Sequence, residues 1–453
     1  MPIPFRALPL SRLTQAALLS LALAGAAQAQ SLQEVYDMAK GYDAAYQAAR
    51  SQYSANLAKA DQGKAALLPG VTMNSSASRS AREVDPTPSA ANTNFSFTTQ
   101  TLGLSASQPL YRPANLATYR QSQKTLLLAE AALQQAEQDL IVRVSQAYFD
   151  VLVSQDSLAF VRAQKTAVAE QLASAKRNFE VGTATITDTR EAQARFDLVT
   201  AQEIAADNDL RVKTVALELL VGKSGLQPKR LQSGQPLPPL EGQNADSWIA
   251  QSEQAHPGIA LARANLEIAR LEIDKASAGH KPTVDLTLGY NVQKNINGTT
   301  VGLVSTGSNQ INLASVGVNL SLPIYAGTAT QNRIRETLAL EEKARQDLEG
   351  AQRQVAQATR TAFLGLQSGL GQVKAYEAAE ASSQVALDAN KLGYQVGVRI
   401  NIDVLNSQSQ LYQTKRDLAK ARYDVLVGQL KLRQAAGVLK AQDLQSINAL
   451  LAP

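Results

Sequence analysis

In the stretch Val396-Gly397-Val398-Arg399-Ile400-Asn401-Ile402-Asp403, a short break interrupts a long helical pattern rich in Ala and Gln. An earlier copy, Val181-Gly182-Thr183-Ala184-Thr185-Ile186-Thr187-Asp188, interrupts a similar pattern. A glycine in such a break is typical of a tight turn, because glycine adopts backbone angles that other residues avoid. The sequence therefore predicts two very long helical hairpins with these two stretches as their tips.

The two tips belong to a tandem duplication. Gly182 and Gly397 lie 215 residues apart (397 − 182), and Pro69 and Pro282 lie 213 residues apart (282 − 69). Each half has the same predicted order of helix, strand, loop, strand, long helix, turn and helix. We expect a first structural repeat at residues 30–222 and a second at residues 247–437. An irregular segment follows each repeat, at residues 223–246 and 438–453.

The helical run of the first repeat, residues 113–180, contains no glycine, and no proline after Pro113. A helix of this length would reach about 100 Å. Apolar and small residues recur along it every seven residues, with a second series four residues on, which is the spacing of a coiled-coil seam. These residues are Leu133, Leu140, Ala147, Val161, Val168 and Ala175, and Val144, Val151, Leu158, Leu172 and Phe179. The second run, residues 329–394, contains Gly365, Gly369 and Gly371, which indicate either a bend or close contact, or simply a helix that tolerates glycine.

Two strands are predicted in the second repeat. In residues 283–293, Val284, Leu286, Leu288, Tyr290 and Val292 alternate with polar residues and glycine, and residues 315–322 repeat this pattern. Such alternation is typical of a strand with one apolar and one polar face. A loop is expected at residues 294–312, and weaker copies of both strands at residues 71–80 and 94–108. Each strand has about the 9 to 11 residues that cross a bilayer in a tilted barrel.

Four strands are too few to close a barrel, because the smallest membrane barrels have about eight. Open strand edges in lipid leave backbone N–H and C=O groups unpaired, at a cost of several kcal/mol each. Slender helical hairpins with narrow apolar seams likewise cannot bury those seams within one chain. The sequence therefore predicts an oligomer.

Residues 1–29 have the pattern of a secretory signal, with Arg6 and Arg12 before an apolar run and Ala27-Gln28-Ala29 at the expected cleavage site. The apolar run is too short for a membrane anchor. The chain has no cysteine, which excludes disulfides, thiolate metal sites and a lipid-modified cysteine after cleavage. The formal charge of +5 is spread without basic runs, so nucleic acid is not an expected partner.

Several motifs together resemble the TolC family of outer-membrane efflux proteins, along essentially the whole mature length. They include Ala66-Leu67-Leu68-Pro69, Gln108-Pro109-Leu110-Tyr111, Ala147-Tyr148-Phe149, Phe179-Glu180-Val181-Gly182, Leu320-Ser321-Leu322-Pro323-Ile324-Tyr325 and Gly393-Tyr394-Gln395-Val396-Gly397. The resemblance implies a mixed α and β fold: a homotrimer whose chains each give four strands to one twelve-stranded outer-membrane β-barrel. A long periplasmic α-helical coiled-coil barrel would continue it, with residues 223–246 and the C-terminal segment in an equatorial belt.

The resemblance also implies a periplasmic gate at the tips. By position, Asp403 would form a threefold carboxylate ring, and Asp188, Tyr394 and Arg399 would form polar links, supported by Thr187. Asn406 departs from the family pattern, which has an acidic residue there, so the ring should be less negative. For Asp188 and Asp403, the alternative is that each carboxylate merely caps the returning helix. A periplasmic adaptor would dock on Val181, Gly182 and Thr183 and on Val396, Gly397 and Val398, although glycine is needed in a tight turn in any case.

The function expected from these features is a passive exit duct, for drug efflux or for type I protein secretion. Its partners would be the periplasmic adaptor and an inner-membrane pump of the ABC, RND or MFS class. A soluble periplasmic coiled-coil scaffold is the alternative. No enzyme, cofactor or metal site is expected, because no nucleotide-binding or nucleophile motif occurs and His256 and His280 have no second ligand nearby in sequence.

Overall fold

A computed structural model describes residues 29–84, 93–232, 235–239, 244–297, 299–301 and 304–452. The expected signal sequence, apart from Ala29, lies outside these residues. The chain divides into two compact units. Unit 1 comprises Met1–Ala49, Gln134–His256 and Gln354–Pro453, and unit 2 comprises Arg50–Leu133 and Pro257–Arg353. Each unit therefore contains parts of both halves of the sequence.

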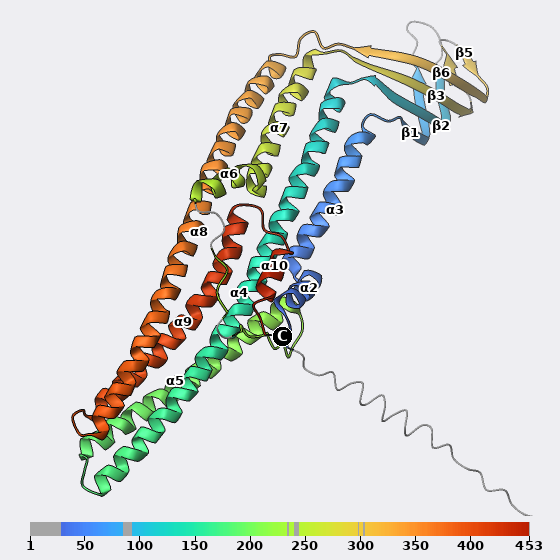
Figure 1. The fold of residues 1–453 in the computed structure, drawn as a ribbon. Helices are drawn as coiled ribbons and strands as arrows, with labels where there is room; N and C mark the ends of the chain where they lie inside the picture. Colours follow the sequence, from blue (N-terminus) through green and yellow to red (C-terminus); the bar gives the residue numbers. More distant parts are fainter. Residues whose placement is uncertain are drawn as a thin grey trace, which may run out of the picture. The chain divides into compact units, whose positions relative to one another are not determined.

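The order of elements confirms the tandem duplication (Figure 1). The first half contains α2 (Leu32–Tyr42), α3 (Ala44–Ala65), β1 (Gly70–Val84), β2 (Thr93–Tyr111), α4 (Pro113–Glu180) and α5 (Ile186–Val221). The second half contains α6 (Ala245–Ala255), α7 (Pro257–Ser277), β3 (Thr283–Ile296), β6 (Asn309–Ser321), α8 (Ala329–Gln395) and α9 (Asn401–Ala435). A 3-10 turn (Ala278–His280) precedes β3, and a small hairpin of β4 (Thr299–Val301) and β5 (Val304–Thr306) lies between β3 and β6. The last helix is α10 (Asp443–Asn448).

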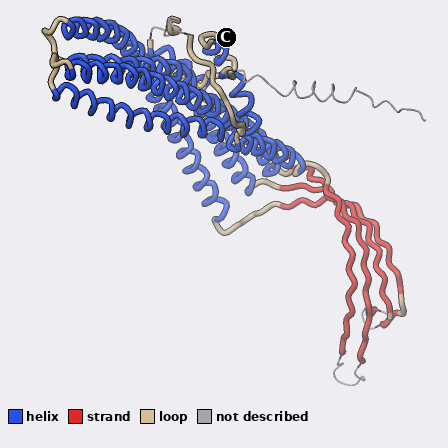
Figure 2. Tube along the Cα trace, turned by 90° about the horizontal axis from the view of Figure 1, so that it is seen from below, coloured by secondary structure: helices blue, strands red, loops and turns tan. Residues whose placement is uncertain are grey.

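Unit 2 contains a four-stranded antiparallel sheet in the order β1-β2-β3-β6 (Figure 2). The strands are longer than the sequence indicated, and the expected loop at residues 294–312 is wrong at both ends. β3 continues to Ile296 and β6 begins at Asn309, because Lys294 and Asn295 still pair with Gln310 and Asn309. These strand ends could not be predicted from alternating apolar and polar residues, because neither face of β3 is apolar beyond Val292.

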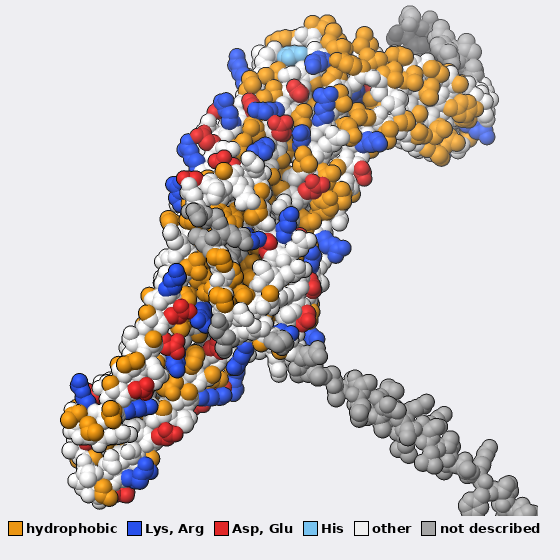
Figure 3. All heavy atoms as spheres, viewed as in Figure 1, with side chains coloured by type: hydrophobic (Ala, Val, Ile, Leu, Met, Phe, Trp, Pro, Cys, Tyr) orange, Lys and Arg blue, Asp and Glu red, His pale blue; other side chains and the backbone are white. Residues whose placement is uncertain are grey.

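One face of this sheet is apolar across all four strands. The pairing places the following residues on it: Val71, Met73, Leu102, Leu104, Ala106, Leu286, Leu288, Tyr290, Val292, Val316, Val318 and Leu320. Many of these side chains are exposed, including Val316 at 77% and Met73 at 67%, and hydrophobic atoms cover much of the sheet surface seen in Figure 3. The opposite face carries mostly Ser, Thr, Asn, Gln and Gly, with Phe97, Ile311 and Leu313 as exceptions. An exposed apolar face this large marks a contact with lipid or protein.

The first half begins with two helices, α2 and α3, which are separated at Asp43. The Asp43 carboxylate accepts a hydrogen bond from the Tyr46 N–H at 2.8 Å and so caps α3. Arg143 of α4 donates two further hydrogen bonds to it, at 2.9 and 3.0 Å. In the second half, α6 and α7 break at the corresponding His256 and Pro257. The two helices are therefore separated by the side-chain cap of Asp43 in the first half and by Pro257 in the second half.

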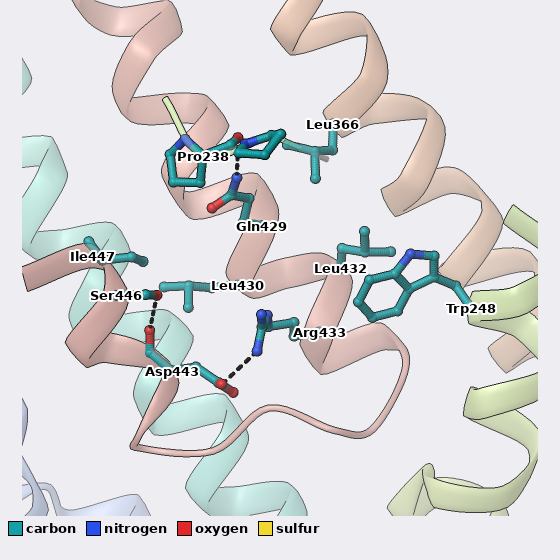
Figure 4. Close-up of a pocket in the computed structure, with 11 residues that line it drawn as sticks. Pro238, Trp248, Leu366, Gln429, Leu430, Leu432, Arg433, Asp443, Ser446 and Ile447 are labelled. Atoms are coloured by element: carbon teal, nitrogen blue, oxygen red, sulfur yellow. Dashed lines mark hydrogen bonds and ion pairs between the residues drawn. The ribbon is translucent and has the colours of Figure 1, made fainter. Parts of the chain in front are cut away.

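Irregular segments cover the middle of unit 1. Gln30 forms a parallel bridge with Pro228, and Leu231 forms an antiparallel bridge with Leu451. Figure 4 shows the next part, where Gln429 of α9 donates to the Pro238 carbonyl at 3.0 Å and Arg433 pairs with Asp443 of α10 at 2.6 Å. The cavity among these residues is about 80 Å³, far below the volume of a drug-sized site.

The coiled-coil seam of α4 is mostly buried within this one chain, where Leu140, Val144, Val161 and Val168 are at most 1% exposed, so the expectation that such a seam cannot be buried by a single subunit is wrong for α4. Phe179 at the tip is the clear exception at 43%. In α8 the three glycines do not break the helix. A Cβ at Gly369 would lie 3.2 Å from a methyl carbon of Val425, which explains that glycine by close helix contact, whereas Gly365 and Gly371 face open space.

Candidate functional site at the hairpin tips

The α4–α5 and α8–α9 hairpins turn with the same backbone geometry, and both tips lie at one end of unit 1 (Figure 1). Gly182 has φ +79° and Gly397 has φ +80°, values that other residues rarely adopt. The Gly182 N–H donates to the Phe179 carbonyl at 3.0 Å, and the Gly397 N–H donates to the Tyr394 carbonyl at 3.1 Å. These bonds pair the last free carbonyls of each outgoing helix with donors in the turn.

The two returning helices begin differently. Thr185 caps α5, and the Asp188 carboxylate accepts from the Thr185 N–H at 2.9 Å and from its hydroxyl at 2.7 Å, which completes a capping box. Ile400 occupies the same position before α9 and has no side-chain cap. Asp403 therefore has no capping partner, and its carboxylate lies 3.7 Å from the Arg399 guanidinium.

Near the tips, Asn401, Asn406 and Tyr394 of the second hairpin each make polar side-chain contact with the first hairpin. Asn401, the first residue of α9, is fully buried; it accepts a hydrogen bond from Gln171 of α4 and donates to the Asp188 carbonyl of α5 at 3.4 Å. Arg195 of α5 donates to the side-chain oxygen of Asn406 at 2.7 Å. The third contact is from the Asn178 amide to the Tyr394 hydroxyl at 3.3 Å.

Apolar side chains hold the start of α9 against both hairpins. Leu405 packs into a cluster formed by Val161, Val168, Leu172, Ala175, Ala192 and Val199 of α4 and α5. Val404, the preceding residue, packs with Leu387 and Leu411 of its own hairpin and against Tyr394. Successive residues of α9 thus face different hairpins, which fixes how this helix is rotated at the tip.

A polar groove of about 670 Å³ lies between the tips. Asp188, Lys391, Tyr394 and Arg399 are among the residues that line it. Beside the groove, the turns expose apolar side chains with the following exposed fractions: Val181 (73%), Val396 (64%), Val398 (75%) and Ile400 (60%). The site combines a small polar opening with an apolar rim.

No cluster of three or more His, Asp or Glu side chains that could bind a metal occurs within the described ranges. Among the helices that the structure describes, none has both the length and the hydropathy of a membrane-spanning helix.

Comparison with known proteins assigns this architecture to a family. The sequence profile described as "Outer membrane efflux protein" matches residues 15–223 and 248–438. The chain belongs to the outer membrane efflux protein family. Its similarity to outer membrane protein TolC of Vibrio cholerae is 33% identity, over 94% of this chain and 95% of that protein. The chain is also 31% identical to the alkaline protease secretion protein AprF of Pseudomonas aeruginosa, over 93% of this chain and 87% of that protein.

Solved structures of bacterial outer membrane proteins share the fold. The Vibrio cholerae outer membrane protein VceC aligns with a TM-score of 0.74 at 19% identity, over 90% of this chain and 96% of that one. The open state of the Neisseria gonorrhoeae MtrE outer membrane channel aligns with a TM-score of 0.72 at 17% identity, over 90% and 89%. The recognition of this family from sequence motifs is therefore confirmed, as is the outer-membrane location.

The structure brings some of the expected gate residues together. Asp188, Tyr394 and Arg399 line one groove, although Asp188 bonds to Thr185 and Tyr394 to Asn178 rather than to Arg399. Thr187 is exposed and forms no hydrogen bond with another described side chain. Asp403 and Asn406 lie on α9 outside the groove lining.

Sequence reasoning missed Asn401, Gln171 and Arg195. Polar residues spaced along Gln-rich helices give no signal that distinguishes a buried contact from a solvated one. The Thr185–Asp188 capping box did have a signal, a Thr followed three residues later by an acid at the start of a helix.

Proposed function

We propose that the chain is one of three identical subunits of an outer-membrane exit duct for efflux or type I secretion. The observation that carries this proposal is the four-stranded sheet with one continuous apolar face and two open edges. Such a sheet can enter lipid only if other copies close it into a barrel, because unpaired backbone groups are costly there. The long hairpins, whose seams are buried by neighbouring helices, supply the periplasmic part of the duct.

The test is to extract the protein from outer membranes with detergent, measure the mass of the complex, and record conductance in planar bilayers. A trimer that forms steady pores supports the duct, whereas a water-soluble monomer would support the scaffold alternative. A matched pair of variants sharpens this test. Val318→Lys puts a charge on the apolar face, which destabilises the barrel in the membrane by about 2–4 kcal/mol per subunit, and should block insertion. Asn319→Lys, one residue on, points to the polar face and should insert and change ion selectivity.

The tips are the proposed periplasmic gate. Three copies of Asp403 would surround the opening, where like charges in a narrow mouth attract cations. Arg399 lies close enough to Asp403 to reduce that charge, and Asn406 adds none. Arg399→Ala and Asp403→Ala are therefore expected to change conductance and cation preference. Unchanged single-channel records in both variants would remove these residues from the gate.

The exposed valines of the two turns are the proposed docking surface for a periplasmic adaptor. Val181, Val396 and Val398 are each at least 64% exposed, and apolar groups clustered at a polar rim favour a protein partner. Val398→Glu should abolish export in cells while the trimer mass and conductance remain. Val385→Glu, an equally exposed valine of α8 away from the turn, is the control. Energy for transport comes in this proposal from the inner-membrane pump, since the duct itself performs no reaction.

A further inference from the structure

The two outer strands of the sheet, β1 and β6, each pair with only one strand of the described chain. β1 runs over 15 residues and β6 over 13, so both edges present long rows of free backbone donors and acceptors. The duplication indicates which strand occupies each of these edges. The strand pairing derived from it rests on the proposed duct and specifies how the subunits of that duct join.

The pairing within each repeat gives the correspondence between strands. Gly70 of β1 pairs with Ser107 of β2, and Thr283 of β3 pairs with Ser321 of β6. β3 therefore corresponds to β1 with an offset of 213 (283 − 70), and β6 corresponds to β2 with an offset of 214 (321 − 107). Each repeat is thus the same strand pair in the same register.

The β2–β3 contact is where the second strand of one repeat meets the first strand of the next repeat. Its register is fixed by pairs such as Ser105 with Gly289. Applying the two offsets to that pair gives 105 + 214 = 319 and 289 − 213 = 76. We propose that β6 of one copy pairs antiparallel with β1 of the next copy of this chain, with Asn319 opposite Ser76.

The proposed register keeps both faces of the sheet continuous across the joint. It sets Val318 opposite Ala77 and Leu320 opposite Ser75 on the apolar face, and Gly317 opposite Ser78 on the polar face. A shift of one residue would place apolar side chains of one copy beside the polar face of the next. Shifts of two residues preserve the faces, so only the duplication distinguishes the proposed register from them.

Cysteine pairs test the register directly, because the chain has no cysteine of its own. Opposed residues of antiparallel strands have Cα atoms about 4.5–5.5 Å apart, which suits a disulfide, whereas a two-residue shift moves them too far apart. Asn319→Cys is combined in turn with Asn74→Cys, Ser76→Cys or Ser78→Cys and oxidised in outer membranes. We expect the Ser76→Cys pair to give covalent dimers and trimers at least about fivefold more than either shifted pair.

An internal control shows whether oxidation works on the polar face. Thr101 and Gln293 already pair within one chain, so Thr101→Cys with Gln293→Cys should form an intrachain bond without dimers. The proposal is overturned if a shifted pair crosslinks most, or if no pair crosslinks while the internal control does. Failure of the unaltered protein to form pores refutes the duct itself, whereas a conducting protein with the wrong crosslink refutes only the register.

Discussion

The buried amide of Asn401 connects α9 to both helices of the first hairpin, and its removal is the most informative single change at the tips. Asn401 opens α9, accepts a hydrogen bond from Gln171 of α4, and donates to the Asp188 carbonyl of α5. Its side chain is fully buried. We expect Asn401→Ala to loosen α9 from the first hairpin and to favour the open tip.

The expected size follows from these contacts. Losing one good amide hydrogen bond and leaving the partly buried Gln171 amide without its partner costs about 2 kcal/mol per subunit. That free energy corresponds to a change of about thirtyfold in the ratio of open to closed tips. The Arg399–Asp403 pair, at 3.7 Å with side chains 59% and 34% exposed, should contribute only about 0.3–0.5 kcal/mol, or about twofold.

Single-channel recording in planar bilayers measures how the fraction of time in open states differs between these variants. Asn401→Ala should spend far more time in high-conductance states than the unaltered protein, and Arg399→Ala should change this little. Asn390→Ala is the matched control, because Asn390 bonds to Ser407 within the second hairpin and does not connect the two hairpins. If Asn401→Ala and Asn390→Ala behave alike, or if Arg399→Ala opens the tip more than Asn401→Ala, the assignment is wrong.

Three further changes test the packing of unit 1. Arg143→Ala leaves the carboxylate of Asp43, which is 7% exposed, without its cation, and should lower the free energy of unfolding in detergent by about 3 kcal/mol, read from the urea midpoint. The hydrogen bonds from Arg143 also hold the pKa of Asp43 below its usual value, so the stability from this pair is present above about pH 4 and is lost as the pH falls further. In Arg143→Ala the free energy of unfolding should therefore fall less steeply below about pH 4. An unchanged pH dependence would contradict this coupling between protonation and stability. Gly437→Ala should prevent assembly, because Gly437 has φ +74° and a Cβ there would lie 2.3 Å from the His256 Cα. Gly225→Ala is the control: Gly225 has φ +77° but faces open space, so the change should lower the free energy of unfolding by only about 1–2 kcal/mol. Equal trimer yields from the two variants would refute the close contact at Gly437.

The sequence predicts local features of this fold well. The turns at Gly182 and Gly397 follow from a single residue type that the backbone geometry requires, and the seam of α4 follows from its seven-residue spacing. Positions that depend on distant partners escape such reasoning. Asp43 breaks a helix without proline because Arg143, 100 residues away, and the Tyr46 N–H both bind its carboxylate.

The two tips show how a duplicated sequence can differ in role. Asp188 and Asp403 occupy equivalent positions, and from the sequence either could be a cap or a gate residue. Thr185 makes Asp188 part of a capping box, whereas Ile400 offers no hydroxyl, so the Asp403 carboxylate remains available to solvent and to Arg399. The side chain three residues earlier decides between the two roles, and the halves differ at that position because Thr185 corresponds to Ile400 at an offset of 215 (400 − 185).

Comparing the two halves also indicates that the proposed β6–β1 contact between copies is weaker than the β2–β3 contact within one chain. Within one chain, Arg112 donates two hydrogen bonds to Asp285, at 2.8 and 2.7 Å, beside the β2–β3 contact. The offsets of 214 and 213 place Ala326 and Thr72 at the corresponding positions of the proposed joint between copies, which therefore lacks this ion pair.

We expect mild heating in detergent to release monomers before the β2–β3 contact opens. The double variant Thr72→Asp with Ala326→Arg should transfer the pair to the joint and raise the temperature at which trimers separate on native gels. Each single variant leaves one charge without a partner and should not raise it. A double variant no more heat-resistant than the singles would mean that Ala326 and Thr72 are not neighbours across the joint.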